Sequence, residues 1–219
     1  LQQNINFSNQ FTLGGGFRAQ KNSIGIGDYL NTSAPDYSEW DSEHTTFLDS
    51  QINYAYNIGL EKKISESFKT YSRIGTGFRY PNIDDRIGGS GGTSLDLKTQ
   101  RTEEFEIGLK QNSENSSYNI STYIIDGRNE LGYDSDGFVN ININSTRRYG
   151  VELSQQYQFN QKIKIKNDFT WSEAKYTSGD QGTYATDFKD RDVPLVPQYS
   201  FDSKLTWNIN RFLRLIPSI

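Results

Sequence analysis

Apolar and polar residues alternate along several stretches of this chain. In residues 161–171, Ile163, Ile165, Phe169 and Trp171 share one parity, and lysine and aspartate side chains occupy the other parity. Side chains of a β-strand point alternately to opposite faces, so this stretch has one apolar face and one charged face. The same alternation recurs along the sequence and predicts an all-β fold made of amphipathic strands.

We expect about nine strands, mostly of the length that membrane barrels use. They span residues 5–7, 11–24, 45–58, 68–78, 102–111, 117–125, 148–159, 161–171 and 199–209. Short turns, one of which is expected at 61–63, alternate with long polar connections at 28–43, 79–98, 126–142 and 177–198. This organisation is typical of a transmembrane antiparallel up-and-down β-barrel. A soluble β-sandwich, whose strands average about 5–6 residues, is the alternative.

The amino-acid composition further limits the class of protein to which this chain can belong. No stretch approaches the ~20 apolar residues of a transmembrane helix, but a barrel strand needs apolar residues only at alternate positions. A mean hydropathy of −0.76 is therefore compatible with a membrane barrel, and an aromatic content of 14% argues against disorder. The chain has no Cys, which excludes disulfides, and no Met, so we expect a fragment, or a mature segment, of something longer. The net charge is −4 without a basic block, which gives no support for a nucleic-acid partner.

Four segments resemble conserved segments of the TonB-dependent outer-membrane receptor family. They are GFRYPN at 77–82, LKTQRTEEFEIGLK at 97–110, RYGVEL at 148–153 preceded by Asn140, and VPLVP at 193–197. Their order and spacing agree with the family, although Thr99 and Gln100 stand where Pro and Glu are commoner. The resemblance implies that residues 1–219 form the later part of a barrel of about 22 strands with a plugged lumen. The plug domain and the terminal strands are then absent from this chain.

The resemblance also implies a function. Receptors of this family import a scarce nutrient across the outer membrane of Gram-negative bacteria, with energy that TonB delivers through the plug. Ferric siderophores and other iron complexes are the most frequent substrates; cobalamin, haem or a glycan, or a passive porin-like barrel, are the alternatives. The implied partners are TonB, outer-membrane lipid and a small iron chelate. Neither a cofactor nor enzymatic chemistry is expected.

The family takes its ligand groups from the outer loops. We therefore expect ligand-binding residues among the charged and aromatic side chains of the predicted loops: Arg79, Tyr80, Asp84, Asp85, Arg86, Tyr133, Asp134, Asp136, Tyr184 and Arg191. The planar guanidinium of Arg79 suits a carboxylate or phosphate of a ligand. A structural pairing of Arg79 with a plug carboxylate is the favoured alternative.

Charged side chains on the inward parity of the strands are expected to face water or the plug: Glu104, Glu106, Lys110 and Glu152. Barrel interiors are polar, so this interpretation is favoured over an acid/base site. His44 is the only histidine, which argues against a Ser/His/Asp set and against a transition-metal site. Residues 134–137 begin like a calcium loop but lack the remaining ligands, which favours an ordinary turn.

Overall fold

The structure is a computed structural model. It describes residues 2–7, 10–27, 46–87, 94–134, 137–143, 145–178, 189–209 and 213–218. The strands of the main sheet are β1 (Gln2–Asn6), β2 (Phe11–Gly27), β3 (Thr46–Lys63), β4 (Phe68–Arg79), β5 (Gln100–Asn112), β6 (Ser116–Arg128), β9 (Thr146–Gln158), β10 (Ile163–Tyr176), β11 (Tyr199–Asn208) and β12 (Arg214–Leu215). They pair antiparallel in this order, so neighbours in sequence are neighbours in space. The predicted up-and-down all-β architecture is confirmed.

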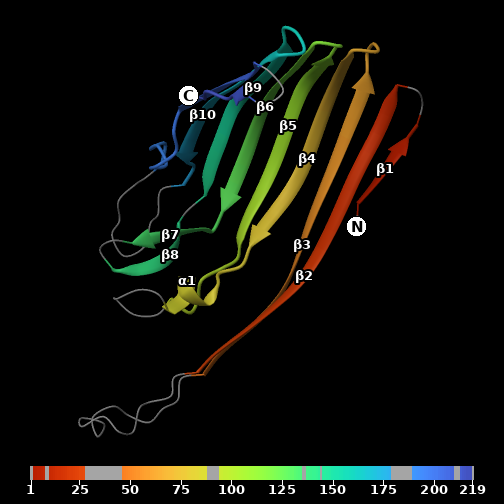
Figure 1. Cartoon of the computed structure of the whole chain (residues 1–219). Helices are drawn as coiled ribbons and strands as arrows, with labels where there is room; N and C mark the ends of the chain where they lie inside the picture. The colour runs from red at the N-terminus through yellow and green to blue at the C-terminus, as the bar shows by residue number, and fades with distance from the viewer. Residues whose placement is uncertain are drawn as a thin grey trace, which may run out of the picture.

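The main sheet is curved, and its connections sort by length (Figure 1). Short turns lie at one end, which we call the turn end. The helix α1 (Ile83–Ile87) and a separate hairpin of β7 (Glu130–Asp134) and β8 (Val139–Ile143) lie at the other, which we call the loop end. β2 and β3 pair along their whole length, whereas β3 pairs with β4 only over 57–63, so β2 and β3 continue past β4 as a two-stranded ribbon. The N- and C-termini lie at opposite side edges of the sheet.

The turn predicted at 61–63 is wrong. These residues belong to β3 and pair with the first residues of β4, and the turn follows at 64–67. Glu61 of β3 forms an ion pair with Lys69 of β4, with 2.7 Å between Oε1 and Nζ. A strand ladder uses backbone groups alone, so a run of charged residues does not end it.

Two of the predicted long loops contain regular structure. In 126–142, β6 continues to Arg128, and residues 139–143 pair with β7, so the expectation of an irregular loop there is wrong. In 79–98, α1 forms a single turn whose start is fixed by a capping box. The Asp85 N–H donates to Asn82 Oδ1 at 2.7 Å, and the Asn82 N–H donates to Asp85 Oδ2 at 2.9 Å. One turn is too short to produce a helical period in the sequence.

The main sheet has an apolar face and a polar face. Residues paired across antiparallel strands point to the same face. One such row crosses β5, β6, β9, β10 and β11 and consists of Leu109, Ile120, Leu153, Phe169 and Phe201. These side chains are 36–59% exposed although they are apolar, and we call their side the apolar face. The opposite side is the polar face, which carries Glu104, Glu106 and Lys110 of β5.

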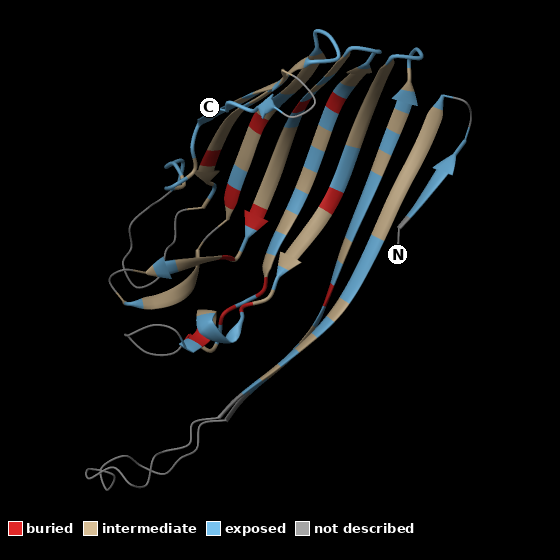
Figure 2. Cartoon of the chain, viewed as in Figure 1, coloured by how far each residue is buried: buried red, intermediate tan, exposed pale blue. Residues whose placement is uncertain are grey.

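Neither face is covered by a second layer within the described residues (Figure 2). Among those residues, only Leu97 and Ala174 are buried hydrophobic side chains. A β-sandwich would bury one face beneath a second sheet, so the sandwich alternative is wrong. No helix in the described parts of the chain is long and apolar enough to span a membrane.

The edge of the apolar face toward the turn end steps from strand to strand. The last apolar residue toward the turn end is Leu109 in β5, Tyr118 in β6, Tyr157 in β9 and Ile163 in β10. By the pairing register, each lies two residues nearer the turn end than the residue named before it. The edge of the apolar face therefore crosses the strands obliquely, as expected for a membrane barrel, whose strands tilt by ~35–45°.

Candidate functional site

The polar face concentrates charge around Arg73 of β4. Arg73 is paired in register with Glu106 of β5, and its Nη2 lies 3.0 Å from Glu106 Oε2. Its Nη1 lies 3.6 Å from Oε1 of Glu104, which shares the same face two residues away. One guanidinium therefore serves two carboxylates.

These residues belong to a hollow of about 240 Å³ on the polar face. We call it the charged hollow, and its polar lining consists of Arg73, Glu104, Glu106, Tyr123, Arg148 and Glu152. The guanidinium of Arg148 is engaged by Glu130, with 2.7 Å between Nη2 and Oε2. Glu104, Glu106 and Glu152 thus bring three negative charges to the hollow. Among the lining residues, the Arg73 guanidinium is the one available to balance this charge. The hollow carries excess negative charge and suits a cationic partner.

Lys110 lies on the same face beyond the charged hollow. Its Nζ is 4.3 Å from the ring centroid of Tyr71, and the Tyr71 hydroxyl donates to Glu106 Oε1 at 2.8 Å. The structure therefore brings together the predicted inward residues Glu104, Glu106 and Glu152, and it links Lys110 to them through Tyr71. Their contact with a plug stays a prediction.

At the loop end, Arg86 of α1 fastens the connection between β4 and β5 to β3. We call this connection, described for residues 80–87 and 94–99, the strap. The Arg86 side chain is 1% exposed, and its Nη2 lies 3.0 Å from Asp49 Oδ2 of β3. The same guanidinium donates to the carbonyls of Leu95 and Leu97. A buried guanidinium needs such partners, and Arg86, predicted to bind ligand, is placed as a clamp.

Arg79 is placed differently from Arg86. It ends β4 with its side chain half exposed, and its Nη2 lies 3.1 Å from both carboxylate oxygens of Asp85. Arg79 thus has a carboxylate partner in the strap, whereas the structural partner expected from the sequence was a plug carboxylate, and that pairing stays a prediction. Asp84, the other acidic residue of α1, is exposed.

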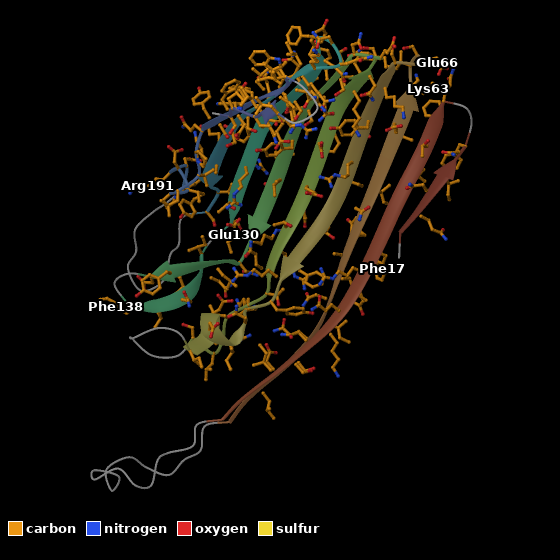
Figure 3. All side chains as sticks on the ribbon, viewed as in Figure 1. Phe17, Lys63, Glu66, Glu130, Phe138 and Arg191 are labelled. Atoms are coloured by element: carbon orange, nitrogen blue, oxygen red, sulfur yellow. The ribbon has the colours of Figure 1, made fainter. Side chains whose placement is uncertain are left out.

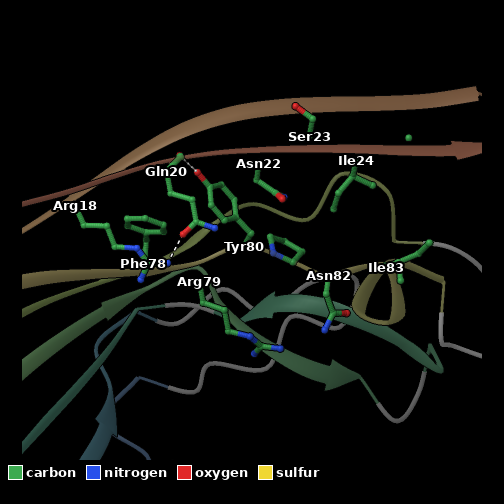
Figure 4. Close-up of a pocket in the computed structure, with 12 residues that line it drawn as sticks. Arg18, Gln20, Asn22, Ser23, Ile24, Phe78, Arg79, Tyr80, Asn82 and Ile83 are labelled. Carbon is green, nitrogen blue, oxygen red and sulfur yellow. Dashed lines mark hydrogen bonds between the residues drawn. The ribbon is translucent and has the colours of Figure 1, made fainter.

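Tyr80 and Arg79 point to opposite sides of the strap (Figure 4). The Tyr80 hydroxyl donates to the Gln20 carbonyl at 2.6 Å, and its ring packs edge-on against Phe78 with 5.4 Å between centroids. A groove of about 640 Å³ lies between β2 and residues 78–83. Arg18 lies over the Phe78 ring at 5.2 Å in this groove. The groove thus presents the Arg18 guanidinium beside aromatic rings, a combination suited to anionic and aromatic ligand groups.

Asparagine side chains join the β7–β8 hairpin to the strap. Asn142 exchanges two hydrogen bonds with the backbone of Lys98: its Oδ1 accepts from the N–H at 2.6 Å, and its Nδ2 donates to the carbonyl at 2.9 Å. Asn140 Nδ2 donates to the Asp85 carbonyl at 2.9 Å. The strap therefore holds both the ribbon and the hairpin, and the three form one connected loop-end layer.

Glu130 anchors the base of the hairpin, while Phe138 lies at its tip (Figure 3). The Glu130 carboxylate accepts hydrogen bonds from Arg148 and Thr146. Burial alone raises the pKa of Glu130, but the hydrogen bonds from Arg148 and Thr146 outweigh it and hold the pKa below its usual value. The carboxylate is thus charged at neutral pH and ties the hairpin to β9.

The other predicted ligand residues are spread over the loop end. Tyr133 is 59% exposed on β7, and Asp134 ends that strand. Arg191 is exposed beside β10, where its carbonyl accepts a hydrogen bond from the N–H of Tyr176. Residues Asp136 and Tyr184 lie outside the described residues. In the parts of the chain that the structure describes, no group of three or more His, Cys, Asp and Glu could hold a metal ion.

Sequence analysis missed residues that organise the charged hollow and the loop end. Asp49, the partner of Arg86, is 37 residues away in the chain, and no local signal identifies it. Tyr71 acquires its role only from the pairing of β4 with β5. For Asn140 and Asn142 a signal existed, because residues 139–143 alternate as a strand does.

A family model described as "TonB dependent receptor-like, beta-barrel" matches residues 1–215. The chain belongs to this family. Its members are β-barrel proteins of the Gram-negative outer membrane, so the apolar face of this receptor wall meets lipid and the polar face lines the lumen. No curated protein matches the sequence.

Solved receptor structures share the fold. The siderophore receptor PiuA from Acinetobacter baumannii is 17% identical with a TM-score of 0.72, and the match covers 98% of this chain and 31% of PiuA. The ferric-catecholate import receptor Fiu from E. coli K12 is 16% identical with a TM-score of 0.68, and the match covers 95% of this chain and 31% of Fiu. The copper transporter OprC is 17% identical with a TM-score of 0.66, and the match covers 94% of this chain and 31% of OprC. The receptor chain described here thus spans about a third of the length of these structures, and the likeness concerns the fold.

Proposed function

We propose that this receptor imports a ferric siderophore or another iron complex across the outer membrane, with energy supplied through TonB. The family match over residues 1–215 carries the proposal. PiuA and Fiu are named as receptors for siderophores and ferric catecholates, which supports an iron complex. OprC is named as a copper transporter, so the test includes other cargoes.

The charged hollow is the proposed contact with the plug domain of the intact receptor. Its three carboxylates exceed the guanidinium charge available to them, so cationic plug side chains would complete the balance. An enclosed lumen has a lower effective dielectric constant than bulk water, which strengthens such pairs and makes them selective. The sequence predicted contact with water or the plug for Glu104, Glu106, Glu152 and Lys110, and the present proposal takes the plug.

The groove beside the strap is the proposed ligand contact of this chain. Arg79 and Tyr80 come from the predicted ligand set, and Arg18 joins them because it lines the same groove. Iron chelates present carboxylate, hydroxamate or catecholate groups, which guanidinium and aromatic side chains can recognise. Arg86 contributes by holding the strap. The remaining predicted residues Asp84, Asp85, Tyr133, Asp134, Asp136, Tyr184 and Arg191 stay ligand candidates of the loop end.

Uptake by iron-starved cells tests the proposal. Cells with and without the receptor gene are given radioactive iron in several siderophores, with haem, cobalamin and labelled glycans in parallel. We expect deletion to abolish the uptake of one iron complex, and loss of TonB to have the same effect. Uptake that persists without TonB would indicate a passive barrel, and unchanged uptake of every compound would overturn the transport proposal.

Two arginine variants examine the ligand contact. Arg79→Ala is expected to raise the concentration for half-maximal uptake about tenfold, because a charge-assisted hydrogen bond to the ligand is lost. Arg128→Ala is the matched control, since Arg128 also ends a strand and its side chain is 63% exposed, but it pairs with Glu103 away from the groove. An equal effect of both variants would contradict a ligand contact at Arg79.

A further inference from the structure

Tyr71 of β4 lies flat across Gly108 of β5 on the polar face. A Cβ atom built on Gly108 would come within 2.5 Å of Tyr71 Cζ and 2.6 Å of its Cε1 and hydroxyl oxygen. The two residues are paired in register, so the ring occupies the space where a side chain at position 108 would stand. A side chain at position 108 would therefore force the Tyr71 ring to move.

The residues on either side of Gly108 on the same face are Glu106 and Lys110, and Tyr71 contacts both. Its hydroxyl donates to Glu106 Oε1 at 2.8 Å, and the Lys110 ammonium lies 4.3 Å from its ring centroid. Arg73 holds the second oxygen of Glu106, with 3.0 Å between Nη2 and Oε2. Both carboxylate oxygens of Glu106 are thus fixed by donors from β4.

A second tyrosine repeats this arrangement two strands away. Tyr123 of β6 lies across Gly150 of β9, where an added Cβ would be 2.9 Å from the tyrosine oxygen and 3.0 Å from Cζ, with the Trp171 carbonyl oxygen nearer still. The residues on either side of Gly150 on that face are Arg148 and Glu152, and both line the charged hollow with Tyr123. In both places a glycine lies between a basic and an acidic residue, and a tyrosine from the preceding strand covers it.

We propose that Tyr71 is a positioning residue that lies across Gly108 and holds the Glu106 carboxylate of the lumen wall in place for cationic groups of the plug, while Tyr123 fills the corresponding space at Gly150. The inference rests on the proposed role of the charged hollow. A flat ring fills the gap beside each glycine without projecting into the lumen, which leaves the carboxylates accessible to an approaching plug. Tyr71 adds a directed hydrogen bond that fixes which way the Glu106 carboxylate points.

Hydrogen exchange of the plug amides in the full-length receptor tests this role. Tyr71→Phe keeps the ring over Gly108 and removes only the hydroxyl that donates to Glu106. We expect exchange of the plug amides nearest the wall to accelerate about tenfold, because the plug pairs with a less ordered carboxylate. The melting temperature of the barrel should stay unchanged, since no strand ladder or packing contact is altered. A merely structural tyrosine would change barrel melting and not plug exchange.

Three further variants separate the possible outcomes. Gly108→Ala displaces the ring and should accelerate plug exchange at least as much as Tyr71→Phe. Gly59→Ala is the matched control, because Gly59 is also a mid-strand glycine of the polar face but its added Cβ meets only the Ser72 carbonyl at an ordinary 3.6 Å. Glu106→Gln tests plug docking itself and should accelerate exchange in the same way.

The variants also distinguish failure of the inference from failure of the proposed function. If Glu106→Gln accelerates plug exchange and Tyr71→Phe does not, the positioning role is overturned while plug docking stands. If neither variant has an effect, docking at the charged hollow is wrong and the inference falls with it. If Gly108→Ala fails to fold, Tyr71→Phe still decides between these outcomes.

Discussion

Removal of Arg86 is expected to release the strap without unfolding the barrel wall. Arg86 is the only guanidinium that joins α1 to β3 within the described residues, and its side chain is 1% exposed. Arg86→Ala leaves the Asp49 carboxylate without its cation and the carbonyls of Leu95 and Leu97 without this donor. The ladders of β3, β4 and β5 are untouched, so the effect should be confined to the loop end.

The size of this effect follows from the burial of the two partners. Removing one partner of a buried ion pair destabilises by ~3–5 kcal/mol. The Asp49 side chain keeps 23% exposure, so water compensates part of the loss and we take the lower end, about 3 kcal/mol. At about 1.4 kcal/mol for each factor of ten, the opening equilibrium of the strap shifts roughly 150-fold.

Hydrogen exchange followed by mass spectrometry measures this opening in the full-length receptor. Peptides that cover 94–99 should exchange roughly 150-fold faster in Arg86→Ala, whereas peptides from β9 and β10 should not change. Arg79→Ala is the control, because its ion pair with Asp85 is half exposed and such pairs contribute about 0–1 kcal/mol, or at most about fivefold. Equal exchange of 94–99 in Arg86→Ala and the unchanged receptor would refute the clamp.

Three further predictions concern the hairpin, the ribbon and the two faces. Because the pKa of Glu130 is depressed on folding, its stabilising effect is present above about pH 4.5 and is lost as pH falls through the lower folded value. A spin label at Phe138→Cys should therefore become mobile on acidification, and this pH step should be absent with Glu130→Gln; a step in both backgrounds would assign it to another group. Tyr80→Phe removes the hydroxyl that donates to the ribbon. Because such a hydrogen bond is worth ~1 kcal/mol, hydrogen exchange of residues 48–56 should rise about fivefold. An unchanged exchange rate would show that this bond is not formed. Ile107→Arg, in the middle of the apolar stretch of β5, should destabilise the folded receptor in lipid by ~2–4 kcal/mol, while Asn119→Arg on the polar face should be tolerated. Equal losses in a denaturant titration would contradict the assignment of the faces.

The strands were predictable because each face of the wall meets a uniform environment. In β5, Phe105, Ile107 and Leu109 alternate with polar residues, and period two follows directly from one lipid-facing side. The error at 61–63 arose from reading charge as a turn signal. Charged residues near the turn end lie at the edge of the apolar face, where the ladder continues without a need for apolar side chains.

The loop end was less predictable because its structure depends on contacts between distant segments. The capping box of α1 places Asn82 and Asp85 three residues apart, but a single turn gives no periodicity that would make this spacing stand out. Arg79 and Arg86 both fall in the long connection predicted at 79–98. Only the position of Asp49 on β3 makes the first a buried clamp and leaves the second at the surface.

Single-cysteine scanning of β5 tests the central claim most directly, because the chain has no cysteine of its own. A fluorophore is attached at each position from 103 to 110 in the full-length receptor, and quenching by a lipid-soluble and by a water-soluble agent is compared. Labels at Phe105, Ile107 and Leu109 should be quenched from the lipid, and those at Glu104, Glu106 and Lys110 should be shielded from it. Loss of this alternation, or lipid quenching at the glutamate positions, would contradict a wall with bilayer on one side and an enclosed polar lumen on the other.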